Sequence, residues 1–196
     1  MRALPHLLLW RLGLARAETQ TTPAERDCLA RHATGRRRLV EIGVWHGVTT
    51  TRLRGAMAND GVLYAVDPYP VGRLGFSAQR YIAHREVARV NRGTVRWIES
   101  TGVDAGRVFV QEKEPPVEFV FIDGDHSYHG LKGDWEAWRL LVTPGGVVAL
   151  HDSRSTPKRS IDDAGSVIFT RDVILRDPLY TVAETVDSLT VVRRGA

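Results

Sequence analysis

The sequence predicts an α/β protein built on one doubly wound, mostly parallel sheet, and three observations predict it. Apolar strand-like segments alternate with helix-like segments along the 196 residues, a pattern typical of βαβ units. Segment 117–122 is nearly all apolar, as expected of a strand buried on both faces. Segments 180–185 and 189–192 are three residues apart, which predicts a terminal antiparallel hairpin because a parallel pair needs a long crossover.

The helices and strands follow from local signals. Thr22, Pro23 and Glu25 form a helix start with a capping box, and this helix is expected to run to about His32. Trp135 and Trp138 fall at helical spacing and are expected to pack in the core. Further strands are expected at 39–42, 62–66, 95–98 and 147–150, and further helices at 48–57, 77–90, 128–141 and 167–175.

Size and composition indicate one globular domain of ordinary length. We expect residues 1–35 to form a helical segment that packs on a single domain of residues 36–196. The lone cysteine, Cys28, excludes an internal disulfide and fits a cytoplasmic protein. The apolar run 7–10 is interrupted by Arg11 and is too short to span a bilayer, so we expect a docking helix and no membrane partner.

The formal net charge of +4 includes two basic runs, at 36–38 and 193–194. These runs are interpreted as solvated arginines beside strand ends, since charge runs are usually surface features. The excess is too small and too scattered to argue for a nucleic-acid partner by itself.

Residues with ligand-binding character follow the first two strands. Gly43 allows a tight turn after the strand, and Gly47 allows the chain to pass close to a ligand. Trp45 stands where a dinucleotide fingerprint has its second glycine, and its bulk would obstruct a pyrophosphate. Asp67 ends the second strand, where a carboxylate can accept hydrogen bonds from ribose hydroxyls. The pattern therefore favours a nucleoside ligand without a pyrophosphate.

Taken together, these motifs resemble the class I S-adenosylmethionine (SAM)-dependent methyltransferases. Within that class the chain is similar to the bacterial small-molecule O-methyltransferases with a strand-end Asp-Gly-Asp-His. The resemblance covers about residues 39–152 and rests on five segments: Glu41-Ile42-Gly43-x-x-x-Gly47, Val66-Asp67-Pro68, Phe121 to Tyr128 with its Asp123-Gly124-Asp125-His126, Pro144-Gly145-Gly146 and His151-Asp152.

The resemblance implies a Rossmann-like sheet in the order 3-2-1-4-5-7-6 and SAM as cofactor. It places Glu41, Gly43 and Gly47 around the methionine part, with Thr49 beside it. It places Asp67 at the ribose, and Ser100 and Thr101 near the adenine.

It also brings the ends of the fourth and fifth strands together. Asp123 and Asp152 could then share a divalent cation, for which Mg²⁺ is expected because it prefers oxygen ligands. His151 stands where relatives carry an acidic residue, and it could be a third ligand, although imidazole is softer than Mg²⁺ prefers. His126 is the first candidate for the base that deprotonates a hydroxyl acceptor, and Asp125 is the second.

These residues lead to a metal-assisted O-methyltransferase acting on a small hydroxylated molecule, such as a sugar or a natural product. The alternatives are a nucleic-acid methyltransferase and a non-catalytic nucleotide-binding module or NAD-dependent enzyme. A homodimer is expected by analogy with relatives. The N-terminal segment and the loops 68–77 and 153–165 are expected to wall the acceptor pocket, because loops on a rigid scaffold usually carry specificity.

Overall fold

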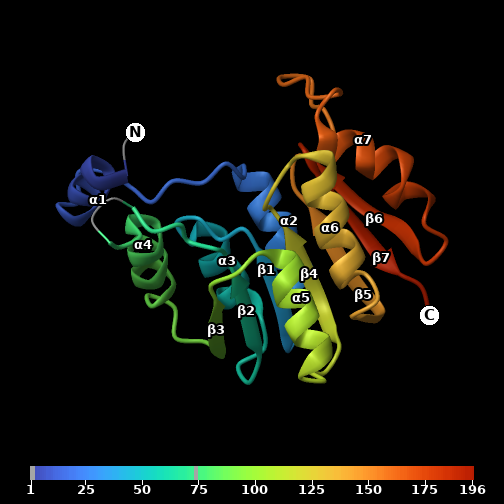
Figure 1. Ribbon diagram of the computed structural model, residues 1–196, viewed down its shortest axis with the longest axis horizontal. Coiled ribbons are helices and arrows are strands. Elements are labelled where there is room, and N and C mark those ends of the chain that lie inside the picture. The colour runs from blue at the N-terminus through green and yellow to red at the C-terminus, as the bar shows by residue number, and fades with distance from the viewer. Residues whose placement is uncertain (1–2, 73–74) are drawn as a thin grey trace.

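The computed structural model describes residues 3–72 and 75–196. Its strands are β1 (Arg38–Ile42), β2 (Val62–Val66), β3 (Thr94–Ile98), β4 (Val117–Ile122), β5 (Val142–Leu150), β6 (Tyr180–Val186) and β7 (Leu189–Arg194). They form one sheet in the order β3-β2-β1-β4-β5-β7-β6, which confirms the predicted order (Figure 1). Strands β1 to β5 pair in parallel, and β7 runs antiparallel to both β5 and β6.

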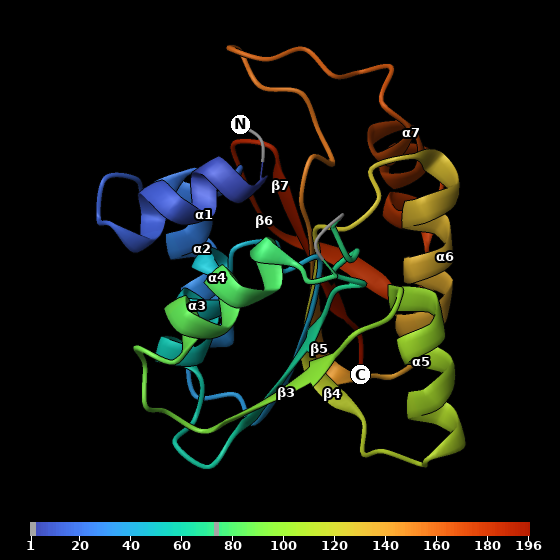
Figure 2. The same cartoon turned by 60° about the vertical axis from the view of Figure 1, so that its left-hand side comes forward.

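Helices cover both faces of this sheet. They are α1 (Ala3–Arg11), α2 (Pro23–Ala33), α3 (Val48–Ala56), α4 (Ala78–Val87), α5 (Gly102–Gln111), α6 (Tyr128–Trp138) and α7 (Gly165–Asp172), followed by the short 3-10 helix η1 (Ile174–Arg176). Helices α1 to α4 lie on one side of the sheet and α5 to α7 on the other (Figure 2). The chain reverses its winding between β1 and β4, so the topological switch point lies there.

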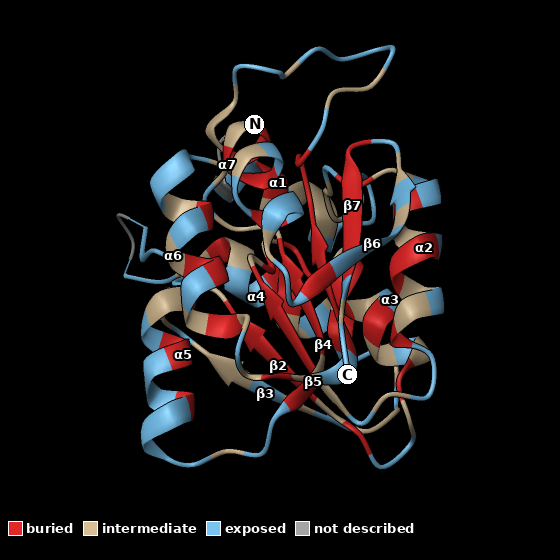
Figure 3. Ribbon diagram, turned by 90° about the vertical axis from the view of Figure 1, so that its right-hand side faces the viewer, coloured by how far each residue is buried: buried red, intermediate tan, exposed pale blue. Residues whose placement is uncertain are grey.

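The core consists of two apolar layers, one on each face of the sheet (Figure 3). Side chains alternate along β1, so Val40 and Ile42 join the layer under α5 to α7, and Leu39 joins the layer under α2 and α3. Trp135 and Trp138 are buried in the first layer, which confirms the core role expected for both. The sheet is thereby a rigid support for the loops at its edges.

Three elements differ from those expected. The sequence did not predict α5, whose signal is weakened by glycine at its first position and at the interior position 106. Thr101 caps this helix by accepting a hydrogen bond from the amide of Asp104. The turn expected at 144–146 lies inside β5, where a register irregularity opposite Val117 and Phe119 accommodates it. Helix α7 ends earlier than expected, and its last turn is the 3-10 helix η1.

The two basic runs lie at the edge of the sheet where the parallel strands begin. The Arg36 guanidinium donates to the Glu118 carbonyl at 2.8 Å, and that of Arg194 to the Leu140 carbonyl at 3.1 Å. Arginine at these strand ends therefore binds free carbonyl groups of the fold itself, on the edge opposite the carboxyl ends of β1 to β5.

The N-terminal segment packs on the helices that cover one face of the sheet. Helix α1 contacts α4, where Trp10 Nε1 donates to Glu86 at 2.6 Å and Arg11 donates to the Tyr81 hydroxyl at 2.9 Å. Helix α2 packs against α3. No helix in the described part of the chain is long and apolar enough to cross a membrane. The boundary between residues 35 and 36 stays a prediction.

Candidate active site at the carboxyl edge of the sheet

Residues that follow three strands extend the backbone ladder of the sheet by one step. The Gly43 amide donates to the last carbonyl of β2 at 2.9 Å, the Asp123 amide to Ile42 at 2.8 Å and the His151 amide to Ile122 at 3.0 Å. These bonds fix the start of each loop, so the side chains that follow β1, β4 and β5 meet at one edge. This is the edge where open α/β sheets bind ligands.

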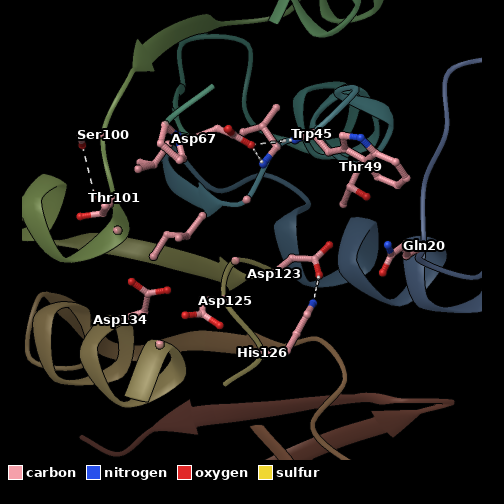
Figure 4. A pocket seen from close by; sticks show the side chains of 18 of the residues that line it. Gln20, Trp45, Thr49, Asp67, Ser100, Thr101, Asp123, Asp125, His126 and Asp134 are labelled. Atoms are coloured by element: carbon pink, nitrogen blue, oxygen red, sulfur yellow. Dashed lines mark hydrogen bonds and ion pairs between the residues drawn. The ribbon is translucent and has the colours of Figure 1, made fainter. Parts of the chain in front are cut away.

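A cavity of about 610 Å³ lies at this edge, at the switch point between β1 and β4 (Figure 4). Its volume falls within the range of small-molecule sites. Of the predicted site residues, the cavity is lined by Gly43, Thr49, Asp67, Ser100, Thr101, Asp123, Asp125 and His126. Those outside its lining are Glu41, Gly47, His151 and Asp152.

The two glycines of the first loop serve different contacts. Gly43 has φ +87°, and a Cβ there would lie well inside contact distance of the Asp123 carbonyl. Gly47 has φ +74°, and a Cβ there would press on Ala83 and Val87 of α4. Gly43 thus allows the β1 and β4 ends to converge at the cavity, whereas Gly47 allows α3 and α4 to approach each other.

The Asp67 carboxylate stabilises the loop that contains Trp45 through hydrogen bonds to backbone amides. Its Oδ2 accepts hydrogen bonds from the amides of Val44 and Trp45, both at 3.0 Å, and its Oδ1 accepts from the amide of Tyr69 at 2.8 Å. An ionised carboxylate offers about four lone-pair sites, so one remains free on Oδ1. The side chain lines the cavity and can accept a ligand hydroxyl while it holds the loop.

Glu41 is fully buried in β1, and neither of its carboxyl oxygens has a hydrogen-bond partner among the described residues. Burial, together with the charges of Asp123 and Asp67, raises the pKa of Glu41 well above its ordinary value. Burial therefore favours the neutral, protonated form of this carboxyl. Glu41 does not line the cavity, and the polar group beside it is the buried Thr50 hydroxyl, which opposes the rise of its pKa.

Thr49, Ser100 and Thr101 occupy opposite ends of the cavity (Figure 4). Thr49 lies 3.2 Å, hydroxyl to hydroxyl, from Thr21, which ties the start of α3 to the N-terminal segment. Ser100 and Thr101 follow β3, and the Ser100 hydroxyl donates to the Thr101 carbonyl at 3.1 Å.

The acidic and imidazole groups form a cluster that differs in one member from the predicted metal set. Ligand atoms of Asp123, His126 and His151 all lie within 4.8 Å of one another. His151 Nδ1 lies 2.7 Å and His126 Nε2 lies 3.6 Å from Asp123 Oδ1. Asp152 is not part of this group, although its Oδ1 lies 3.8 Å from His151 Nε2; both of its oxygens accept from the Arg159 guanidinium, at 2.6 and 2.9 Å.

His151 is held as a cation. Its side chain is buried, which by itself lowers the pKa, but the carboxylates of Asp123 and Glu25 outweigh burial and raise the pKa to about 10. An imidazolium has no lone pair for a metal. The residues as arranged therefore do not fit Mg²⁺ on Asp123, Asp152 and His151, because both acids already face cations of the chain.

Glu25 was recognised in the sequence only as a capping residue. Its Oε1 accepts hydrogen bonds from the amide and the hydroxyl of Ser188, at 2.9 and 2.7 Å, and its Oε2 lies 3.6 Å from His151 Nε2. Burial raises its pKa, but His151, Thr22 and Ser188 outweigh burial and lower the pKa to about 2. One carboxylate thus joins α2, the β6–β7 turn and the site; no sequence signal links residues so far apart.

The two candidate bases have different surroundings. Asp125 Oδ1 accepts from the amide of Ser127 at 2.8 Å and helps to start α6. His126 lines the cavity, and its carbonyl accepts from the Ser166 amide at 2.9 Å, so the start of α7 fixes its backbone. His126 is the freer side chain of the two.

The expected walls of the pocket are found in part. Glu18, Thr19 and Gln20 of the segment between α1 and α2 line the cavity, as does Pro68. No residue of 153–165 is part of its lining, and that loop projects from the molecule (Figure 2). Within the loop 68–77, residues 73–74 lie outside the described residues. The buried Asp134 of α6 also lines the cavity, although no sequence motif pointed to it.

Comparison with solved structures shows the same fold. TomG from Streptomyces achromogenes, an O-methyltransferase of tomaymycin synthesis in complex with SAM, is 18% identical; the match covers 100% of this chain and 91% of that one, with a TM-score of 0.68. An O-methyltransferase from Bacillus cereus in complex with S-adenosylhomocysteine is 21% identical, covers 99% and 91%, and has a TM-score of 0.65. An rRNA methylase from Streptococcus thermophilus is 14% identical, covers 91% and 100%, and has a TM-score of 0.61.

At the level of sequence, an uncharacterized protein of Sinorhizobium fredii, y4gI, is 29% identical over 126 residues. The match covers 62% of this chain and 14% of the length of that relative. A family model described as a methyltransferase domain matches residues 40–153, which is more than half of the chain and contains most of β1 and all of β2 to β5. The chain therefore belongs to this family of methyltransferase domains.

Proposed function

We propose that this protein transfers a methyl group from SAM to a hydroxyl of a small molecule. The observation that carries the proposal is the cavity at the switch point, which joins a nucleoside-binding side to an acid–imidazole side. Asp67, Ser100 and Thr101 line the first side, and Asp123 and His126 line the second. Donor and acceptor would thus share one enclosed space, as in-line transfer requires.

The expected cofactor contacts agree with the local chemistry. One ribose hydroxyl would donate to the free lone pair of Asp67, and the adenine would lie beside Ser100 and Thr101. The methionine part would lie toward Gly43 and Thr49, with the unpaired Glu41 behind it. SAM, when bound, supplies the electrophilic methyl group on its sulfonium.

His126 is proposed as the base. Its side chain lines the cavity, and its Nε2 is 3.6 Å from Asp123 Oδ1. Nε2 takes the proton from the acceptor hydroxyl as its oxygen attacks the methyl carbon. The Asp123 carboxylate then stabilises the imidazolium by its opposite charge. Asp125 stays the second candidate.

The proposal routes no step through a metal. The acids predicted to hold Mg²⁺ are balanced by His151 and Arg159, the two cations that contact them. Metal assistance stays a prediction of the sequence, with Asp123, Asp152 and His151 as its ligands. The possible ligand atoms that lie together in the structure are those of Asp123, His126 and His151, and His151 would have to lose a proton before it could bind a metal.

A small acceptor is favoured over a nucleic acid because the cavity has the volume of a small-molecule site and the basic runs lie at the opposite edge of the sheet. The rRNA methylase shares the fold, and fold alone does not decide the substrate. The homodimer stays a prediction; the exposed Leu4, Leu8 and Leu12 of the N-terminal segment are the apolar surface for its contacts.

The test is release of S-adenosylhomocysteine from SAM in the presence of sugars, phenols and other hydroxylated acceptors. His126→Ala should lower kcat by about 100-fold or more and leave the affinity for S-adenosylhomocysteine unchanged. His32→Gln, at an imidazole that pairs with Glu184 outside the cavity, is the control. Full turnover by His126→Ala would remove this residue as the base, and methylation of RNA but of no small acceptor would favour the alternative substrate.

A further inference from the structure

We propose that the Asp134 carboxylate accepts a hydrogen bond from the exocyclic amino group at position 6 of the cofactor's adenine. Asp134 is then the residue that selects adenine over other purines. The inference rests on the proposed SAM site and adds to it a specificity residue supplied by α6.

The first observation is the environment of the side chain. Asp134 is 6% exposed and lines the cavity, yet it has no hydrogen-bond or ion-pair partner among residues 3–72 and 75–196. Water can reach this carboxylate in the open cavity, so a ligand that displaces the water must itself supply hydrogen bonds to it. An ionised carboxylate only accepts hydrogen bonds, so the missing partner must be a donor.

The second observation is the space kept open around the carboxylate. A Cβ on Gly102 would collide with Asp134 Oδ1, and a Cβ on Gly124 would lie 3.3 Å from Oδ2. Neither glycine has the positive φ that would itself require glycine. The absent side chains at the two loops that follow β3 and β4 therefore leave room for the Asp134 carboxylate and for the neighbouring Ile42 side chain.

The third observation is position. Asp134 lies on the side of the cavity with Ser100 and Thr101, away from Thr49 and His126 (Figure 4). The base would lie on this side, whereas the amino acid part and the sulfonium would lie toward Thr49 and His126. The six-amino group is the exocyclic donor of adenine, so it matches the acceptor-only carboxylate. Burial, with the charge of Asp125, raises the pKa of Asp134 to about 6, which leaves the group ionised at pH 7.5.

Calorimetric titration with three ligands tests this role: S-adenosylhomocysteine, its 6-deamino analogue and its 6-oxo analogue. The wild-type protein should bind the 6-deamino analogue about 10- to 100-fold more weakly than S-adenosylhomocysteine, the range for a hydrogen bond to a charged group. In Asp134→Ala the affinity for S-adenosylhomocysteine should fall to that for the 6-deamino analogue. The affinity for the 6-deamino analogue should stay at its wild-type value. Glu99→Gln makes the same change of charge outside the cavity, beside Ser100, and should keep the wild-type preference.

Asp134→Asn provides a second variant of nearly the same shape. Its amide can donate to the 6-oxo group, so its preference should shift toward the 6-oxo analogue by about tenfold relative to the wild type. Equal wild-type affinity for S-adenosylhomocysteine and its 6-deamino analogue would overturn the inference. An equal loss for both ligands in Asp134→Ala would also overturn it, since that marks a structural role. No binding of S-adenosylhomocysteine by the folded wild-type protein would instead overturn the proposed SAM site.

Discussion

His151 Nδ1 lies 2.7 Å from Asp123 Oδ1, and the opposite ring nitrogen lies 3.6 Å from Glu25 Oε2. The imidazolium is thus held between two carboxylates, one in the cavity wall and one on α2. Together with Arg159, this buried cation offsets two of the three negative charges of Glu25, Asp123 and Asp152. Stability and chemistry at this edge of the sheet therefore depend on the same three side chains.

Glu25→Gln should destabilise the protein by about 3 kcal/mol, because it leaves His151 with a buried charge that one carboxylate balances in place of two. The matched variant is Asp27→Asn, on the same helix as Glu25. It removes the same charge from an exposed pair with Arg52 and should cost less than about 0.5 kcal/mol of folding free energy. Urea unfolding at pH 7.5 measures both. Equal losses in the two variants would contradict the buried ion triad.

A Gly43→Ala variant should lose about 3 kcal/mol or more of folding free energy and should disturb the cavity. The new methyl group would meet the Asp123 carbonyl, and alanine is also strained at φ +87°. Gly35→Ala is the control, since it has φ +72° but open space around its Cβ, and it should cost only about 1 kcal/mol. Thermal or urea unfolding gives the difference. Similar losses in both would mean that the close approach of the β1 and β4 ends carries no energy.

Because His46 is buried as a neutral imidazole, we expect the free energy of unfolding to fall in weak acid. Its Nδ1 accepts from the Glu18 amide at 3.0 Å, and its ring stacks on His6. Burial, followed by the nearby His6, lowers its pKa to about 4, and Glu18 opposes this shift. The unfolded chain takes up the proton near pH 6.5, so stability is complete above that pH and falls as the pH drops toward 4.

The measurement is the free energy of unfolding at pH 7.5 and at pH 5.0 for the wild type and for His46→Asn, whose amide oxygen can replace Nδ1 as acceptor. The wild type should lose about 1–2 kcal/mol more than the variant between these two values. Identical pH dependences would show that His46 does not carry the effect.

A chelator tests whether methyl transfer needs a divalent cation, as the sequence predicts, or proceeds without one, as we propose from the structure. Turnover should be unchanged by EDTA, because His151 and Arg159 already balance Asp123 and Asp152. The measurement is the rate of S-adenosylhomocysteine release before and after chelation, with Mg²⁺ added back. Loss of turnover that Mg²⁺ restores would support the metal-assisted reaction and contradict the charge balance proposed here.

Much of this architecture is readable from local pattern. The apolar run at 117–122 predicts the central strand β4, and the short connection at 186–188 predicts the hairpin of β6 and β7. The periodic tryptophans indicate the buried face of α6. Helix α5 was missed because its signal depends on a single cap, Thr101, followed by glycine. Local rules describe a helix start well only where several signals coincide, as they do from Thr22 to Glu25.

The site was predictable as a set of strand-end residues but not as a set of contacts. Asp67 and His126 line the cavity as their positions after β2 and β4 led us to expect. The partners of these side chains come from distant segments: Glu25 reaches His151 across the fold, and Arg159 takes both oxygens of Asp152. Such pairings depend on tertiary placement, which one sequence does not encode in any local spacing.

The most direct test of the central claim is calorimetric titration of the folded protein with S-adenosylhomocysteine. We expect one site with a micromolar dissociation constant. Asp67→Ala should weaken this affinity at least about tenfold, because the change removes both the proposed ribose acceptor and the hydrogen bonds that hold the Trp45 loop. Glu99→Gln should bind like the wild type. No binding by the folded wild-type protein would contradict the methyl-donor site placed at this edge of the sheet.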